Sequence, residues 1–123
     1  MDTILVVEDE RILREMIVEG LRRRGYEVLI AGDGHEAVRI CAKRHKPIHV
    51  MLCDAMMPGL RPRELIRIAV EMYPSLIVLI MTAYAEKYFL PTGNSEGYHF
   101  IQKPFTSSEL AARLAAILGG ACA

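Results

Sequence analysis

Hydrophobic residues form five short runs along the chain, each four to six residues long and followed by polar or turn-forming residues. The runs cover residues 3–7, 26–31, 48–53, 76–81 and 99–102. Apolar runs of this length are typical of strands that are buried on both faces of a parallel sheet. The third run ends at a carboxylate, Asp54, and the chain then turns at Pro58-Gly59. Asp54 either caps that turn, as aspartate often does, or lies at the sheet edge where open α/β folds bind ligands.

The segments between the runs have helical periodicity. Apolar stripes predict helices after the first, second, third and fifth runs. Gly25 is expected to end the first helix, and capping-box patterns at residues 33–36 and 106–109 are expected to start the second and the last. Residues 85–90 allow about two helical turns, because proline and glycine follow within residues 91–97. The fourth helix is therefore predicted to be short or irregular.

Five strands alternating with about five helices predict an α/β fold, a flavodoxin-like, doubly wound parallel sheet in the order 2-1-3-4-5. A chain of 123 residues is expected to form a single domain, residues 1–123. Its core is predicted to span residues 3–118, with residues 119–123 forming a tail or the start of a linker.

Composition narrows the possible functions. The 52% hydrophobic residues suffice for a core, and 15 basic side chains balance 15 acidic ones. This balance argues against binding to nucleic acid or to an anionic membrane surface. No apolar run approaches the ~20 residues that cross a bilayer. Asp2 and Glu8 interrupt any signal peptide, and three cysteines without C-x-x-C spacing fit a reducing, cytoplasmic location.

Reactive polar residues stand at the ends of four of the five predicted strands. They are Glu8-Asp9 after the first, Asp54 on the third, Thr82 on the fourth and Lys103 after the fifth. Because parallel strands share one carboxyl edge, all of these side chains are expected at the same edge of the sheet. The sequence therefore predicts a site there that combines three acids, a hydroxyl and a lysine.

These motifs, in this order, resemble the receiver domain of two-component response regulators. The resemblance extends over essentially the whole chain and is carried by Glu8-Asp9, Asp54, Met57-Pro58-Gly59, Thr82-Ala83 and Lys103-Pro104-Phe105. The stretch from Phe100 to Phe105 also resembles receivers at the C-terminus of hybrid histidine kinases. One departure is Glu8, where many receivers have aspartate.

The resemblance implies that Asp54 accepts a phosphoryl group from a phosphohistidine on a sensor histidine kinase or a histidine phosphotransfer domain. A carboxylate can attack phosphorus, and phosphoryl transfer needs mainly positioning and charge neutralisation. Lys103 is expected to pair with one phosphoryl oxygen as a point charge, and the Thr82 hydroxyl to donate to another. The expected role is that of a phosphoacceptor signalling domain rather than an enzyme. With no effector domain in the sequence, its output is expected to pass through a partner or a further portion of chain.

A divalent cation is expected beside Asp54. The three carboxylates contribute about −3 and Lys103 about +1 when ionised, so the site is anionic before it receives another anion. Mg²⁺, or Mn²⁺, suits oxygen ligands of this kind. We predict Asp9 and Asp54 as direct ligands and Glu8 as a ligand through water. The resemblance implies that the backbone carbonyl of Met56 is a further ligand.

Five residues at or next to the site have expected roles in switching, in accommodating the phosphoryl group or in controlling its lifetime. The resemblance pairs Thr82 with an aromatic switch at Phe100, which could equally be a core aromatic because it lacks a hydroxyl. Ala83 is expected to leave room for the phosphoryl group. We hypothesise that Met56 and Tyr84 cover the site and slow attack by water.

Three other functions remain to be compared with this one. A flavin- or nucleotide-binding module would need a glycine-rich turn after the first strand, where Glu8-Asp9-Glu10 would instead repel phosphate. An aspartyl-phosphate phosphatase usually has D-x-D spacing, whereas Asp54 is followed by Ala55-Met56. A degenerate receiver would bind partners without phosphorylation, and the intact set of Asp9, Asp54, Thr82 and Lys103 argues against it.

Overall fold

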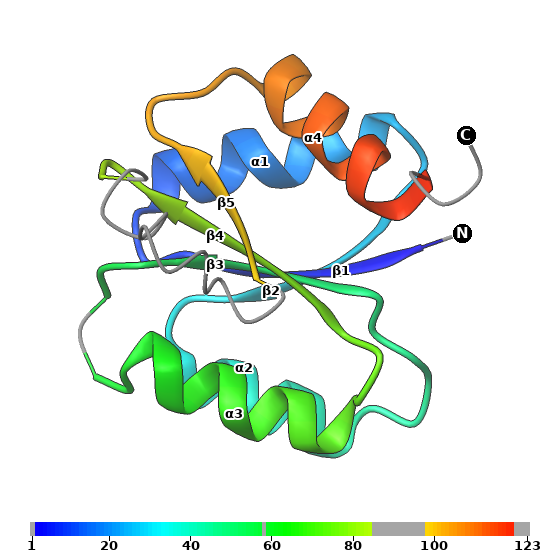
Figure 1. Ribbon diagram of the computed structural model, residues 1–123, viewed down its shortest axis with the longest axis vertical. Helices are drawn as coiled ribbons and strands as arrows, with labels where there is room; N and C mark the ends of the chain where they lie inside the picture. Colours follow the sequence, from blue (N-terminus) through cyan, green and yellow to red (C-terminus); the bar gives the residue numbers. More distant parts are fainter. Residues whose placement is uncertain (1, 58, 85–97, 120–123) are drawn as a thin grey trace.

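Five parallel strands form one sheet in the order β2-β1-β3-β4-β5, as predicted (Figure 1). The strands are β1 (Thr3–Val7), β2 (Glu27–Ala31), β3 (Val50–Asp54), β4 (Ile77–Thr82) and β5 (His99–Gln102). The structure is a computed structural model that describes residues 2–57, 59–84 and 98–119. Strand starts differ from the predicted ones by at most two residues, and β3 and β4 each extend one residue further, to Asp54 and Thr82.

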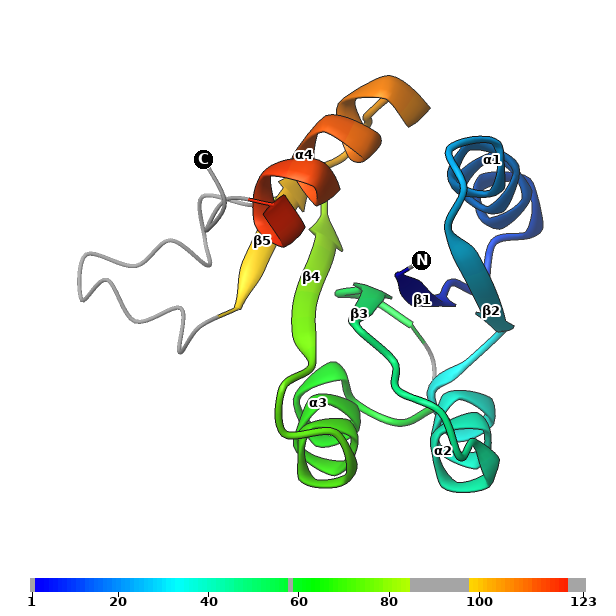
Figure 2. The ribbon, with the colours of Figure 1, turned by 90° about the vertical axis from the view of Figure 1, so that its right-hand side faces the viewer.

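Two helices cover each face of the sheet (Figure 2). One layer consists of α1 (Arg11–Arg23) and α4 (Ser107–Gly119), and the other of α2 (Gly34–Lys43) and α3 (Pro62–Met72). These four are the helices of the described residues, against about five predicted. The expected short helix at residues 85–90 lies outside them.

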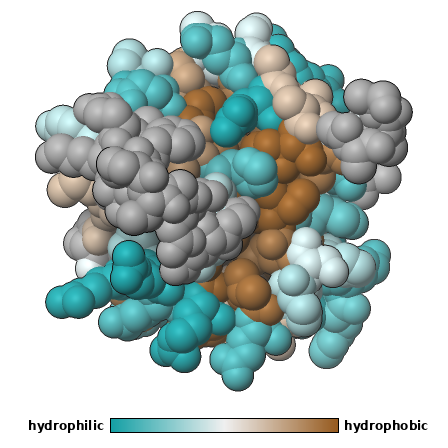
Figure 3. Space-filling view, viewed as in Figure 1, coloured by the Kyte–Doolittle hydropathy of each residue, from teal (hydrophilic) through white to brown (hydrophobic). Residues whose placement is uncertain are grey.

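The central strands are apolar because both of their faces are covered. Side chains alternate between the two layers along a strand. On β1, Ile4 and Val6 pack toward α1 and α4, whereas Leu5 and Val7 pack toward α2 and α3. Figure 3 shows hydrophobic surface between α4 and α3, over the β4 side of the sheet, framed by hydrophilic side chains. The core therefore holds the strand ends at one edge in fixed relative positions.

The capping boxes predicted at the starts of α2 and α4 are largely present in the structure. Thr106 Oγ1 accepts the Glu109 N–H at 3.0 Å, and Glu109 Oε1 accepts the Thr106 N–H at 3.0 Å, which completes the capping box of α4. At α2, Asp33 Oδ1 accepts the Glu36 N–H at 2.8 Å. The Glu36 side chain, however, binds the N–H of Gly32 rather than that of Asp33, so this box differs from the predicted pattern.

Cys41 and Cys53 are buried in the core between the sheet and the α2–α3 layer, as expected for small apolar side chains. Cys122 lies outside the described residues. Gly25 adopts a φ of 89° just after α1, in the left-handed region that favours glycine, which accounts for the end of that helix.

Candidate functional site

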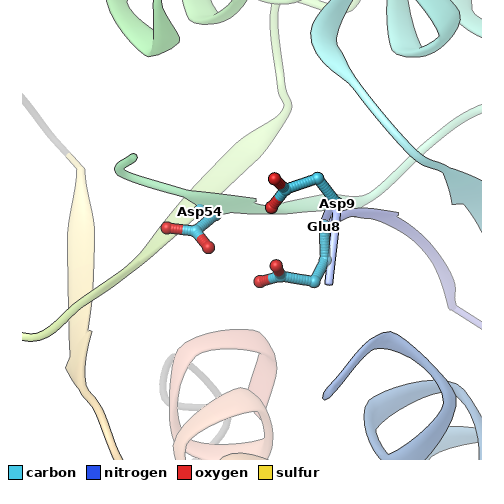
Figure 4. A group of neighbouring side chains, drawn as sticks. All are labelled: Glu8, Asp9 and Asp54. Carbon is cyan, nitrogen blue, oxygen red and sulfur yellow. The ribbon is translucent and has the colours of Figure 1, made fainter. Parts of the chain in front are cut away.

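Three carboxylates meet at the carboxyl edge of the sheet. Oxygen atoms of Glu8, Asp9 and Asp54 all lie within 4.8 Å of one another. Figure 4 shows the side chains of Glu8 and Asp9 extending from the end of β1 toward Asp54 on β3. The predicted convergence of acids from separate strands is therefore present in the structure.

Asp54 is held from two sides. Its Oδ1 accepts the backbone N–H of Met56 at 2.9 Å, and its Oδ2 accepts a hydrogen bond from Lys103 Nζ at 2.7 Å. The residue is only 6% exposed. Both expectations for this aspartate thus hold together: it caps the turn after β3, and the same carboxylate lies in the acidic cluster. The two contacts fix the orientation of the carboxylate.

Glu8 is almost fully buried, with an exposed fraction of 1%. Its Oε2 accepts the N–H of Glu10 at 3.0 Å, while Oε1 has no hydrogen-bond partner among the described residues. Burial, together with the neighbouring Asp54, raises the pKa of Glu8 to about 7, against the opposing effects of the Glu10 N–H and of Lys103. A buried carboxylate oxygen without a hydrogen-bond partner is unusual in a native structure and fits a bound cation.

Lys103 supplies the positive charge of the site. Its Nζ lies 2.7 Å from Asp54 Oδ2 and 3.6 Å from Glu8 Oε1. Burial alone would lower the pKa of Lys103, but the hydrogen bond to Asp54 and the charges of Glu8 and Asp54 outweigh it and raise that pKa. Lys103 is therefore a charged partner of two carboxylates and not a surface lysine.

Thr82 ends β4 next to this cluster and is 3% exposed. Its Oγ1 accepts the N–H of Tyr84 at 3.0 Å, which leaves the hydroxyl proton available to donate. The backbone N–H of Lys103 donates to the Thr82 carbonyl at 2.8 Å. The hydroxyl and the ammonium that were expected to act together therefore come from hydrogen-bonded strands.

The flanking residues differ from one another in exposure. Phe100 is 6% exposed and packs in the core on the α2–α3 side, so its predicted burial is confirmed and its switch role stays a prediction. Met56 and Tyr84 are 74% and 51% exposed. Much of each side chain lies in solvent, and the role of covering the site against water stays a prediction. Ala83 is exposed, in the turn after β4.

Two residues that sequence reasoning did not single out also contact the site. Arg14 Nη1 donates to the backbone carbonyl of Glu8 at 3.0 Å, which ties α1 to the acidic loop. Gln102 Nε2 donates to the carbonyls of Ala83 and Lys103. Two features of the sequence could have indicated these contacts. Arg14 is a cation in the first turn of the helix that follows the acidic pair, and Gln102, the only glutamine in the sequence, stands beside Lys103.

The arrangement suits a hard divalent cation. All of the clustered side-chain donors are carboxylate oxygens, and with Lys103 protonated the formal charge is about −2 when all three acids are ionised. One of these acids, Asp54, contacts the Lys103 ammonium, and Thr82 ends the strand that pairs with that of Asp54. Across the parts of the chain that the structure describes, no helix has both the length and the apolar character needed to cross a membrane.

Comparison with known proteins agrees with the family resemblance seen in the sequence. Residues 4–115 match the family model described as response regulator receiver domain. The probable transcriptional regulatory protein TcrX of Mycobacterium tuberculosis is 34% identical over 117 residues, which make up 94% of this chain and 49% of TcrX. The sensor kinase CckA of Brucella abortus is 33% identical over 112 residues, 89% of this chain and 12% of that kinase. The chain thus spans about half of TcrX and a smaller part of CckA.

Solved structures match over nearly the whole chain. The receiver domain of a hybrid histidine kinase CckA superimposes with a TM-score of 0.80 at 34% identity, covering 94% of this chain and 98% of that one. The chemotaxis response regulator CheY4 of Vibrio cholerae gives a TM-score of 0.83 at 27% identity, covering 95% and 98%. The acidic cluster described above is of the type that holds magnesium in such domains.

Proposed function

This chain belongs to the response regulator receiver family, and we propose that Asp54 is the residue that accepts the phosphoryl group. Receiver domains act in two-component signal transduction as phosphoacceptor modules that work with histidine kinases. The observation that carries the proposal is the environment of Asp54. It lies within 4.8 Å of the acids that would share a cation, and it contacts the lysine that would bind the incoming group.

The proposed reaction is an in-line attack by an Asp54 carboxylate oxygen on the phosphorus of a partner's phosphohistidine. A P–O bond forms, and the P–N bond breaks with its electron pair going to the imidazole nitrogen. Asp54 gives up its negative charge as the acyl phosphate forms. The Lys103 ammonium, which contacts Asp54 Oδ2 at 2.7 Å, then pairs with a phosphoryl oxygen. The Thr82 hydroxyl donates its proton in a hydrogen bond to another phosphoryl oxygen.

We assign the cation site to Mg²⁺, or Mn²⁺, with Asp9 and Asp54 as direct carboxylate ligands. Glu8 would contribute through water, and the Met56 carbonyl would complete the protein ligands. The buried Glu8 oxygen without a hydrogen-bond partner supports this assignment. When bound, the ion neutralises negative charge on the carboxylates and on the phosphoryl group.

The phosphodonor is proposed to dock on the rim of the acidic site. Exposed apolar side chains stand there on three segments, Ile12 on α1, Met56 after β3 and Tyr84 after β4, with exposed fractions of 74%, 74% and 51%. Exposed apolar side chains that gather in one patch mark protein interaction surfaces, and these three follow the segments that carry Glu8-Asp9, Asp54 and Thr82. A phosphohistidine side chain that enters the acidic site would bring its own protein surface against these residues. Because the proposed phosphodonor is a phosphohistidine, we propose that the donor protein is a histidine kinase or a histidine phosphotransfer domain.

The experiment that tests the proposal is phosphorylation by a small phosphodonor. The protein is incubated with acetyl phosphate and Mg²⁺, and the modified residue is located by mass spectrometry. We expect one phosphoryl group on Asp54, dependent on the metal and abolished in Asp54→Asn. A folded protein that stays unlabelled would reject the proposal and favour a receiver that binds partners without phosphorylation. Labelling at another residue would reject Asp54 as the acceptor.

A further inference from the structure

The side chain of Gln102 joins the ends of two strands. Its Nε2 donates to the carbonyl of Ala83, which follows β4, at 2.5 Å, and to the carbonyl of Lys103, which follows β5, at 3.1 Å. Both acceptors are carbonyl oxygens, so the group between them must be the amide NH₂, which has two protons to donate. The amide is thus shared between the segments that carry the Thr82 hydroxyl and the Lys103 ammonium.

These two hydrogen bonds continue the β4–β5 pairing past its last backbone contact. Thr82 is paired with Gln102 in the parallel register, and the Lys103 N–H donates to the Thr82 carbonyl at 2.8 Å. The next residue on the β4 side is Ala83, whose carbonyl is held by the glutamine side chain instead of a strand bond. Gln102 therefore fixes the turn after β4 against the start of the segment after β5.

The shape of this turn decides where the Thr82 hydroxyl points. Thr82 Oγ1 accepts the N–H of Tyr84, so a movement of the Ala83 peptide changes the direction left for the hydroxyl proton. The Gln102 amide also binds the backbone carbonyl of Lys103, so the same side chain constrains the backbone from which the Lys103 ammonium extends. Groups that act on one transferring phosphoryl group must keep their separation closely, since misplacements of about 1 Å can slow a reaction substantially.

We propose that Gln102 is a positioning residue for phosphoryl transfer: its amide holds the Ala83 and Lys103 carbonyls together and so sets the separation of the Thr82 hydroxyl and the Lys103 ammonium. The inference rests on the proposed function of Asp54. In this proposal Gln102 acts through the two backbone carbonyls that it binds, and not by contact with the phosphoryl group or the cation. Its removal should therefore affect the binding of the phosphoryl group and leave the affinity for the metal unchanged.

Two variants of similar size test the proposal. Gln102→Met removes the donor without adding charge, and Gln102→Glu replaces the donor by acceptors that face two carbonyls. The measurements are the rate of Asp54 labelling by acetyl phosphate at saturating Mg²⁺, the affinity for beryllofluoride as a phosphoryl analogue, and the affinity for Mg²⁺ by calorimetry. We expect both variants to lose about fivefold to tenfold in rate and in beryllofluoride affinity, with Mg²⁺ affinity unchanged.

Thr106→Ala is the control for general loosening near the end of β5. It breaks the capping box of α4, so it should lower the midpoint of urea unfolding without changing the labelling rate. A loss confined to Gln102→Glu would point to charge repulsion and overturn the proposal. Unchanged rates in both variants, or a parallel loss of Mg²⁺ affinity, would also overturn it. Labelled wild-type protein with unaffected variants rejects this inference alone, whereas unlabelled wild-type protein rejects the proposed function with it.

Discussion

Lys103 has two opposing effects on the site. Its ammonium lies 2.7 Å from Asp54 Oδ2 and 3.6 Å from Glu8 Oε1, and these carboxylates raise its pKa, so it is charged at neutral pH. That charge is needed to bind a phosphoryl oxygen, but it also repels a divalent cation held by the same acids. The lysine therefore favours phosphoryl binding at some cost to metal affinity.

The variant Lys103→Met should separate the two effects. We expect Asp54 labelling by acetyl phosphate to fall about 100-fold or more, because a charge that binds the transferring group is lost. Mg²⁺ affinity should rise about threefold to tenfold, because removing a nearby positive charge lowers the repulsion. Calorimetric titration with Mg²⁺ checks the second effect. Lys43→Met, in the last turn of α2, is the matched control and should change neither quantity. Weaker Mg²⁺ binding in Lys103→Met would contradict this account of the charge balance.

Helix α1 carries an exposed isoleucine in its first turn, close in sequence to the acids of the site. Ile12 is the second residue of the helix, and α1 starts directly after Glu8-Asp9-Glu10. An isoleucine that is 74% exposed contributes little to the core, so its replacement should cost little stability. We expect the Ile12 side chain to contribute instead to the binding of a protein phosphodonor.

Replacing Ile12 by serine should slow phosphotransfer from a protein while leaving chemistry intact. We expect transfer from a phosphorylated histidine kinase or phosphotransfer domain to lose about fivefold or more in kcat/KM, as for loss of an apolar interface contact. Labelling by acetyl phosphate should stay at the wild-type rate. Met72→Ser, at the end of α3 and 41% exposed in the wild type, is the matched control for loss of an exposed apolar side chain. Equal effects of Ile12→Ser on both donors would argue against a docking role.

The strand-end residues were predictable because strand direction alone brings them together. Once Asp54 and Lys103 are placed at the ends of parallel strands, they must share one edge of the sheet. The α4 capping box was equally predictable, since Thr106 and Glu109 have the spacing that the reciprocal hydrogen bonds require. The contacts of Arg14 and Gln102 were not predictable, because both side chains bind backbone carbonyls. The position of a carbonyl depends on the local turn, and its residue type carries no mark of it.

At the scale of the whole molecule, the sequence pattern again predicts how the elements are arranged but not how deeply each residue is buried. Near-continuous apolar strands require helices on both faces, and the observed two-plus-two arrangement around the order β2-β1-β3-β4-β5 meets that requirement. The burial of Glu8 to 1% follows from the same layering, because the residue directly after β1 still lies between the helix layers. A sequence pattern can place an acid at a strand end, but the depth of its burial depends on how the surrounding layers close.

Burial of Glu8 links the stability of the whole domain to pH and to the cation. The pKa of Glu8 is raised to about 7 from an ordinary value of 4.5. Between these values the folded protein binds more protons than the unfolded chain, so without metal this group lowers the free energy of unfolding as the pH rises. The loss is absent below the ordinary pKa and complete above the raised one. Glu8→Gln removes this titration, and the titrating groups that do not interact with Glu8 cancel in the difference between the two proteins.

Urea unfolding of both proteins at several values from about pH 5 to about pH 8, first in a chelator and then in Mg²⁺, measures this linkage. In the chelator, we expect wild type to lose stability relative to Glu8→Gln as the pH rises. Added Mg²⁺ should stabilise wild type more at pH 8 than at pH 6, because the cation favours ionised Glu8 and competes with its proton. The variant should show a smaller pH dependence of Mg²⁺ stabilisation. Equal stabilisation of wild type at both pH values would mean that the Glu8 carboxylate takes no part in binding the cation.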